Sequence, residues 1–410
     1  MRKHELPAWV GPAACVCAAY GMAMLIVAMF TGQWVTRGHF YYSYTLQAVN
    51  WLNGRLDIAN GEDYAWLELA IRDGRYYVSF PPFPSYVLLP FAAICGMDTP
   101  DAWIALFFAM LSCVYAVRLY IAMTGGTRHL LFFVLFLLLG NGYLYLTMNG
   151  WVWFIAQNMC MALSLMALYY ACVGKGGVSF ALWACAVGCR PMTALYFPLL
   201  AWLAVRRWKQ RDPSLTLWRL VRRKWYWAIL PVLIGGSYMV LNWLRFGNVL
   251  EFGHNYLPEF TRTTTGQFNI CYFWRNVLTY LELPEWQGSW DGVSFTGVDG
   301  CAFYLVNPFF LTAAAAWGWA LVKKRDRNRA MLVLLPVLLL AQAAIICLHK
   351  TLGGVQFGNR YLVDLLPFAF TGLLLWKPDS DRFVHLSAPL AVMGTAVNLI
   401  GTVMSYNNLL

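Results

Sequence analysis

Charged side chains are scarce in this sequence. Asp, Glu, Lys and Arg make up only 12% of its 410 residues, whereas 60% are hydrophobic and 17% are aromatic. A soluble domain of this length has too little polar surface to cover so much apolar surface, which excludes a soluble globular protein. The apolar runs predict an all-α polytopic membrane protein with about 11 transmembrane helices. These spans start near residues 10, 83, 102, 130, 151, 179, 226, 301, 330, 361 and 385.

The sequence also lacks the motifs of several enzyme classes. It contains no P-loop, no GxSxG motif and no residue cluster with strong metal-ligand spacing, so nucleotide hydrolysis and serine chemistry have no support. No cofactor is indicated with certainty, and a divalent metal stays open. No internal repeat is evident, which disfavours a repeat-built transporter. Residues 1–410 are therefore predicted to form one membrane domain.

Positive charge is concentrated in two segments between spans. Residues 204–225 hold eight Lys and Arg against a single acid, Asp212, and residues 323–329 read KKRDRNR. Because cytoplasmic loops carry the excess of Lys and Arg, both segments and Met1 are predicted to be cytoplasmic. An odd number of spans then puts the C-terminus outside, and the same topology puts the long loops 31–82 and 244–300 outside. The net charge of +11 is thus a topology signal, and no nucleic-acid partner is expected.

The first outer loop, residues 31–82, is too polar to cross a bilayer but is patterned enough to fold. Between His39 and Asn53, apolar and aromatic residues recur at three and four positions, which predicts an amphipathic helix in the membrane interface. Asp73-Gly74 then suits a type I′ turn between two alternating runs, which predicts a β-hairpin. One side of that ribbon is apolar and polar groups line the other. The apolar pairs are Leu67 with Phe80, Leu69 with Val78 and Ile71 with Tyr76.

The second outer loop, residues 244–300, mixes polar and aromatic side chains. His254, Asn255 and Tyr256 lie in this mixture, which suits a pocket for a sugar or a head group. A folded cap at the bilayer surface is an equally good interpretation, because aromatic residues are expected there in any membrane protein. A third outer segment, residues 349–364, is short. The three outer segments can converge above one bundle of helices.

Three basic residues are candidates for binding the donor phosphate, and Asp364 is a candidate for binding the acceptor or the sugar. Arg190 lies in the apolar run 179–203 with no acid on the same helix, so it must face a cavity, a partner or an anionic ligand such as phosphate. A snorkelling or paired structural arginine is the alternative. Arg360 and Asp364 are four residues apart and share a helix face, which predicts an ion pair. Asp364 could instead hold Arg360 toward an anionic ligand, with Lys350 close by.

The candidates for a catalytic base lie in the outer loops. Asp57 follows the predicted interfacial helix, His39 follows the first span, and Glu259 lies in the second outer loop. A carboxylate or an imidazole can accept a proton from an acceptor hydroxyl. An exposed loop acid and an interfacial histidine are the structural alternatives for Asp57 and His39.

Four segments resemble the GT-C class of membrane glycosyltransferases, in particular the bacterial relatives of the dolichyl-phosphate-mannose protein mannosyltransferases. They are WLNGRLDI (51–58), DGRYYVSFPPFP (73–84), CRPMTALYFPLL (189–200) and FGNRYLVDLLPF (357–368). The order of spans and long outer loops is similar to that class over nearly the whole chain. The resemblance implies a multi-pass glycosyltransferase of the plasma membrane, with its active site on the extracytoplasmic side.

By that resemblance the donor is a polyprenyl-phosphate sugar, and the acceptor is a glycan, lipid or protein of the cell envelope. Such enzymes usually carry an acid just after the first span as the base. Here that region reads TGQWVTRGHFYY, with no Asp or Glu before Asp57. Either Asp57, His39 or Glu259 takes the role, or the protein is a non-catalytic membrane protein of the same architecture that binds or transports a lipid phosphate or glycolipid.

Overall fold

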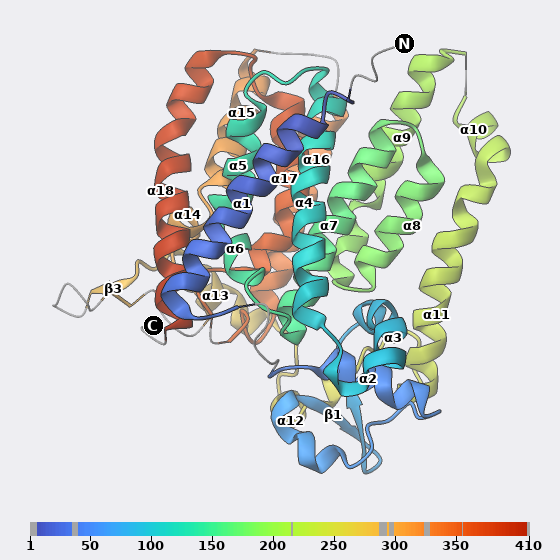
Figure 1. Cartoon of the computed structure of the whole chain (residues 1–410). Coiled ribbons are helices and arrows are strands. Elements are labelled where there is room, and N and C mark those ends of the chain that lie inside the picture. Colours follow the sequence, from blue (N-terminus) through green and yellow to red (C-terminus); the bar gives the residue numbers. More distant parts are fainter. Residues whose placement is uncertain are drawn as a thin grey trace.

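The protein is a bundle of apolar helices with a folded layer at one end (Figure 1). The computed structural model describes residues 6–34, 40–214, 216–286, 293–294, 299–323, 329–354 and 356–407. Within these ranges, six helical segments are long and apolar enough to cross a membrane. They are α1 (Val10–Thr31), α4 (Asp101–Thr124), α7 (Val152–Cys172), Leu217–Phe246, α16 (Arg329–Leu348) and α18 (Asp381–Tyr406). The chain is therefore a multi-pass, all-α membrane protein, as the sequence predicts.

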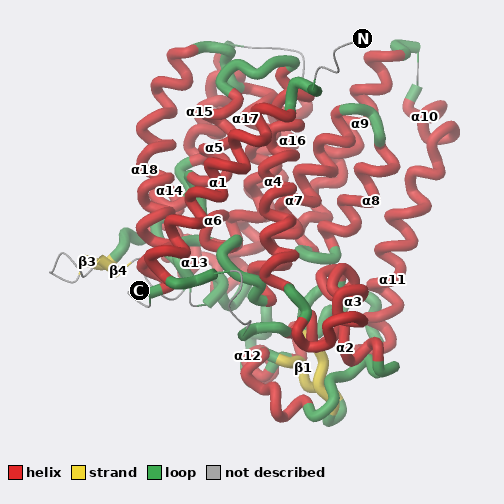
Figure 2. Tube along the Cα trace, in the orientation of Figure 1, coloured by secondary structure: helices red, strands yellow, loops and turns green. Residues whose placement is uncertain are grey.

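Shorter elements complete the bundle and its folded end (Figure 2). The apolar ones are α3 (Phe83–Cys95), α5 (Leu130–Leu139), α8 (Gly176–Val187), α9 (Phe197–Arg211), α11 (Ile229–Phe246), α15 (Phe309–Val322) and α17 (Leu366–Trp376). The others are α2 (Ser43–Leu52), α6 (Tyr143–Leu146), α10 (Leu217–Lys224), α12 (Pro258–Thr261), α13 (Phe273–Leu281) and α14 (Phe303–Val306). Four short strands are β1 (Leu69–Arg72), β2 (Arg75–Val78), β3 (Glu285–Trp286) and β4 (Val293–Ser294).

The apolar run 179–203 is a helical hairpin and not a single span, which corrects the sequence interpretation. The helix α8 ends at Gly188, and Arg190 is extended with φ −140° and ψ 100°. Pro191 follows, and a residue before proline is driven out of the helical region. The chain then returns through the 3₁₀ turn η3 (Pro191–Tyr196) into α9, whose Phe197 ring packs 5.1 Å from that of Phe180.

The predicted span starting near residue 83 also differs in the structure. The helix α3 has 13 residues and is about 20 Å long at 1.5 Å per residue, which is too short for a hydrocarbon core of about 30 Å. It packs beside α2 at the folded end of the bundle (Figure 1). Ser85 ties the two helices together, because its hydroxyl donates to the carbonyl oxygen of Tyr44 at 3.0 Å. The segment is short because Gly96 and the turn after it end the helix.

The two ends of the bundle differ in charge and in content. The N-terminus, the basic helix α10 and the end of α9 lie at one end (Figure 1). At the opposite end lie α2, α3, the β1–β2 hairpin, α12 and the C-terminus. The predicted cytoplasmic segment 204–225 is thus at the end away from the folded layer. Among the six long segments α7 is the most buried and α18 is one of the least buried, so α7 is a central helix of the bundle.

The described part of the first outer loop forms the predicted helix and hairpin, with two differences in what they bury. The helix α2 forms, and β1 and β2 pair with Leu69 opposite Val78 and Ile71 opposite Tyr76. Asp73 and Gly74 both have positive φ, as a type I′ turn requires. The second face of the ribbon is not polar, however. Ala70 and Tyr77 are buried there against Phe246 of α11, because the second outer loop covers that face. The helix α2 is likewise mostly buried, since α3 packs on it.

Candidate functional site

The turn after α8 brings Arg190 to the folded end of the bundle. Its Nε donates to Oδ2 of Asp364 at 2.7 Å, and the second carboxylate oxygen accepts from Nε2 of Gln157 at 3.0 Å. The acid is 6% exposed, whereas the Arg190 side chain is 23% exposed. Asp364 therefore orients Arg190 while leaving part of the guanidinium accessible. The predicted ion pair between Arg360 and Asp364 is wrong. The Asp364 carboxylate binds Arg190, in the turn after α8, and does not bind Arg360 on its own segment.

Arg360 is a buried cation without a carboxylate partner in the described part of the chain. It is 5% exposed and begins the 3₁₀ turn η8 (Arg360–Leu365). Its Nε and Nη2 donate to the carbonyl oxygen of Gly353 at 3.2 and 2.7 Å. Its Nη1 is buried and makes no hydrogen bond in the structure. Burial lowers the pKa of Arg360, and the nearby charge of Arg190 lowers it further. A buried, unpaired N–H on a cation costs free energy that an anionic ligand would recover.

Aromatic rings hold the two arginines close together. The Tyr361 ring centroid lies 4.9 Å from Cζ of Arg190 and 4.9 Å from Cζ of Arg360. Trp153, at the start of α7, places its ring 5.6 Å from Cζ of Arg360. Cation–π contacts of this kind stabilise a guanidinium without neutralising it. Arg190 is paired with Asp364, whereas Arg360 has no carboxylate partner in the described part of the chain, so the positive charge of Arg360 is not neutralised by direct contact.

Two carboxylates approach this positive cluster from the outer loops. Glu68 ends the 3₁₀ turn η1 (Gly61–Leu67), and its Oε2 accepts from Nε1 of Trp153 at 3.2 Å. Partial burial raises the pKa of Glu68, and the charge of Glu259 raises it further, whereas Arg360 and the Trp153 hydrogen bond lower it. Partial burial also raises the pKa of Glu259, which Lys350 opposes. Lys350 reaches α12, where its Nζ donates to the carbonyl oxygen of Glu259 at 2.6 Å.

Two neutral histidines complete the enclosure. Nδ1 of His254 donates to the carbonyl oxygen of Ser79 at 2.5 Å, and Nδ1 of His349 donates to that of Thr351 at 2.6 Å. The pKa of each ring is lowered to about 4, mainly by burial, and the positive charge of Arg190 contributes to this lowering. Phe260 lies between them, 6.3 and 5.7 Å from the two rings. The second and third outer segments therefore meet over the arginines.

The remaining predicted site residues lie elsewhere. Asp57 pairs with Arg55 at 2.8 Å after α2. Asn255 is exposed and donates to Glu251 at 2.6 Å, and the Tyr256 ring stacks on Phe246 at 5.3 Å. None of these contacts reaches Arg190 or Arg360. His39 lies outside the described residues.

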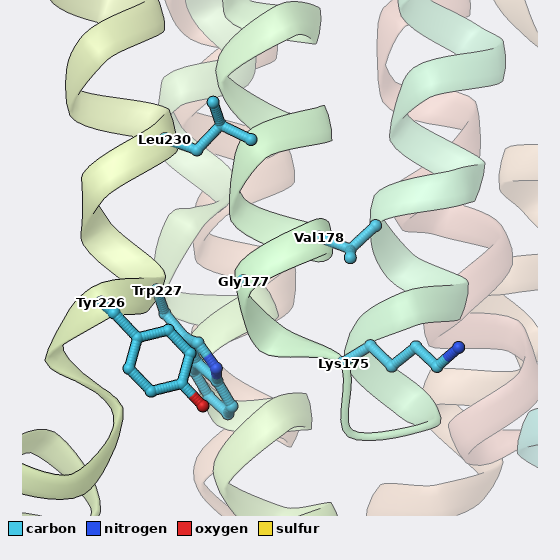
Figure 3. A pocket seen from close by; sticks show the side chains of 6 residues that line it. All are labelled: Lys175, Gly177, Val178, Tyr226, Trp227 and Leu230. Atoms are coloured by element: carbon cyan, nitrogen blue, oxygen red, sulfur yellow. The ribbon is translucent and has the colours of Figure 1, made fainter.

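The described ranges contain no group of three His, Cys, Asp or Glu side chains that could hold a metal ion. A groove of about 340 Å³ opens at the basic end of the bundle (Figure 3). It is lined by Lys175, Gly177, Val178, Tyr226, Trp227 and Leu230. Its walls are mostly apolar, and Figure 3 shows the Lys175 side chain pointing away from Tyr226 and Trp227. The groove lies far from the arginine cluster in the fold and adds no reactive group to it.

Several residues of the cluster escaped the sequence interpretation. Glu68 was one of many loop acids, and its only signal was its place beside an apolar alternating run. Gln157, Trp153 and His349 sit at ends of apolar segments, where polar and aromatic residues are common in membrane proteins. Their convergence depends on helices that are distant in sequence.

The fold and site define a multi-pass membrane protein with a cationic cluster enclosed by its connecting segments. The structure is similar to ArnT from Cupriavidus metallidurans bound to undecaprenyl phosphate, with a TM-score of 0.49 and 12% identity over 95% of this chain and 75% of ArnT. It is also similar to the Archaeoglobus fulgidus oligosaccharyltransferase in its apo form, with a TM-score of 0.47 and 12% identity over 96% of this chain and 56% of that one. Both are glycosyltransferases of the GT-C class, which the sequence motifs resemble.

No protein-family model and no curated protein sequence matches the chain. At 12% identity the likeness to the two enzymes concerns the fold alone.

Proposed function

We propose that the protein is a membrane glycosyltransferase that takes a sugar from a polyprenyl-phosphate donor. The single observation behind this proposal is the buried Nη1 of Arg360, which has no hydrogen-bond partner in the structure and lies beside a second arginine. A guanidinium fork matches the oxygens of a phosphate. In the proposed complex Arg360 and Arg190 bind the phosphate, and Lys350 lies at the rim.

The charges of the cluster suit this chemistry. When the bond from the sugar to the phosphate breaks, negative charge develops on the phosphate oxygen that leaves. Fixed cations in an enclosed site stabilise that charge more than water does. The two arginines are held by Asp364, Tyr361 and Gly353 before any ligand arrives, so little reorganisation is needed.

The acceptor would bind at the same end of the bundle, where the outer loops enclose His254 and Glu259. The basic helix α10 lies at the opposite end, which favours an extracytoplasmic site by the positive-inside rule. A glycan, lipid or protein of the cell envelope is the proposed acceptor. Asn255 in the same loop is exposed, so a large acceptor could reach it, whereas Tyr256 is partly buried against Phe246.

A binding or transport protein for lipid phosphates is the second candidate, because the same cations would serve it without any transfer. The presence of two carboxylates beside the cations favours the transferase, since a binder of an anion gains nothing from negative charge there.

Binding and transfer can be measured on the purified protein in lipid nanodiscs. We expect undecaprenyl phosphate to bind, and sugar to be transferred from at least one of a panel of polyprenyl-phosphate sugars. Arg190→Gln should weaken binding of undecaprenyl phosphate, whereas Arg262→Gln, at an exposed arginine of the same end, should not. Binding without any transfer by the unmodified protein would favour the second candidate. Equal binding by both variants and the unmodified protein would refute the assignment of Arg190, and no binding at all would refute both candidate functions.

A further inference from the structure

Glu68 lies next to the cations through a shared tryptophan. Its Oε2 accepts the hydrogen bond from Nε1 of Trp153 at 3.2 Å, while the ring of that same indole lies 5.6 Å from Cζ of Arg360. The carboxylate and the guanidinium thus contact the same indole, one at its N–H and the other near its ring. The group lies at the surface of the site, because Glu68 is exposed. It can therefore meet a ligand and exchange a proton with water.

The backbone of Glu68 is held in an unusual conformation. Its φ is 57° and its ψ is 56°, the left-handed region that a glutamate seldom adopts. The carbonyl oxygen of Glu68 accepts from the Ser79 hydroxyl at 3.3 Å, and the Ser79 carbonyl oxygen accepts from His254 at 2.5 Å. Two outer loops therefore fix this residue. Strain of this kind is found at functional sites, where surrounding contacts over-determine the conformation.

We propose that Glu68 is the general base that activates the acceptor hydroxyl. This proposal rests on the proposed glycosyltransferase function. The O–H bond of the acceptor breaks and its proton passes to a carboxylate oxygen of Glu68. The acceptor oxygen forms a bond to the anomeric carbon of the donor sugar, and the bond from that carbon to the phosphate oxygen breaks. Its electron pair stays on the lipid phosphate beside Arg360, and Glu68 later releases its proton to water.

The other acids are placed less well for this role. Asp57 is neutralised by Arg55 at 2.8 Å and has no contact in the structure with Trp153 or the arginines. Glu259 makes no side-chain hydrogen bond to Trp153 or to either arginine in the described part of the chain, and Lys350 binds only its backbone carbonyl oxygen. Asp364 is bound by Arg190 and Gln157 and is buried, so it has no oxygen free for an acceptor.

The pH dependence of sugar transfer provides a second test of Glu68 as the base, independent of the loss of rate in a variant. The groups that face it are Glu259 from α12, Arg360 from η8 and the Trp153 N–H from α7. Its pKa is raised, so the base is protonated and inactive at acidic pH, and activity should rise as pH increases through that pKa. Removing the charge of Glu259 should lower the pKa of Glu68 and move this acidic limb to lower pH.

The test compares Glu68→Gln with Glu62→Gln, which changes an exposed glutamate of the same loop. Glutamine can still accept the Trp153 hydrogen bond. We expect Glu68→Gln to lower the transfer rate by about a hundredfold to ten-thousandfold, the typical value of a positioned base. Binding of a polyprenyl-phosphate sugar should stay within about threefold of the unmodified protein, because Glu68 does not touch the phosphate. Glu62→Gln should change neither quantity.

Two further variants distinguish a base from a structural residue. Glu68→Asp should retain part of the activity, since the carboxylate remains but moves by about one bond length. Glu259→Gln should shift the acidic limb of the pH profile to lower pH, as argued above. Full transfer activity in Glu68→Gln would overturn the proposal, as would a loss confined to Asp57→Asn. In both of those outcomes the unmodified protein still transfers sugar. If the proposed glycosyltransferase function is wrong, the unmodified protein transfers no sugar, so the two failures can be distinguished.

Discussion

Replacing Arg360 by methionine is expected to weaken ligand binding while leaving the unliganded protein about as stable. Methionine has a similar length and no charge. In the unliganded protein Nη1 of Arg360 is buried without a partner, which costs about 1–3 kcal/mol. The two N–H groups of Arg360 share one acceptor, the Gly353 carbonyl oxygen, and together return about 1.5–3 kcal/mol, the contribution of a charged hydrogen bond. These contributions nearly cancel, so the free energy of unfolding should change by less than about 2 kcal/mol.

The effect on binding should be larger. A hydrogen bond between a guanidinium and a phosphate contributes about 1.5–3 kcal/mol. Since about 1.4 kcal/mol corresponds to a factor of ten, Kd for polyprenyl phosphate should rise about 10- to 150-fold. Arg262→Met, at an exposed arginine, is the matched control and should leave Kd unchanged.

Thermal unfolding in nanodiscs, with and without polyprenyl phosphate, measures both quantities in one experiment. Ligand that binds only the folded state raises Tm, so the shift reports binding. We expect Arg360→Met to keep the Tm of the unliganded protein and to lose most of the ligand-induced shift. A variant that keeps the full shift would refute the argument that Arg360 binds phosphate. A variant whose unliganded form unfolds at a much lower temperature would refute the argument that the cost of the unpaired Nη1 offsets the hydrogen bonds to Gly353.

Three further predictions concern the support of the site. Asp364→Asn should lower the free energy of unfolding by about 2 kcal/mol in chemical denaturation, less than for a fully buried pair because its arginine partner is partly exposed. Gly188→Ala should cost about 1–3 kcal/mol, since a Cβ there would lie 2.2 Å from the Tyr238 hydroxyl, whereas Gly235→Ala meets no atom within 4 Å and should be tolerated. The pKa of His349 falls from 6.5 to about 4 on folding, so stability should be full above pH 6.5 and fall by at most about 3 kcal/mol between pH 6.5 and 4. A His349→Gln variant should show a flatter pH dependence of Tm over that interval.

The elements that could be predicted from sequence are those whose signal is local. The alternation around Asp73-Gly74 predicts both the hairpin and its register, because a two-residue turn fixes which residues face each other. The helix between residues 43 and 52 follows from its apolar period. The membrane class follows from the length and number of apolar runs. Each of these needs only neighbouring residues.

The interpretation of Arg190 shows where local reasoning ends. An apolar run of span length predicts one helix, whereas Gly188 and Pro191 indicate a break in it. The hydropathy of a helical hairpin and of a single span is similar, so apolar length alone does not distinguish them. The spacing of Arg360 and Asp364 was equally misleading. A spacing of four residues brings two side chains together in an α-helix, but η8 is a 3₁₀ turn, in which residues three apart share a face. Arg190, which is distant in sequence, binds Asp364 instead.

By itself the sequence determined that the chain is a helical membrane protein, that its first outer loop contains a hairpin, and that its unpaired arginines need an anion or a partner. Only the tertiary structure decided which arginine Asp364 orients, that Arg360 keeps an unsatisfied N–H beside Arg190, and that Glu68 shares Trp153 with Arg360. The physical reason is the range of the interactions. Hydrophobic periodicity and turn geometry act between residues a few positions apart, whereas burial and charge pairing depend on segments that meet only after the bundle has folded.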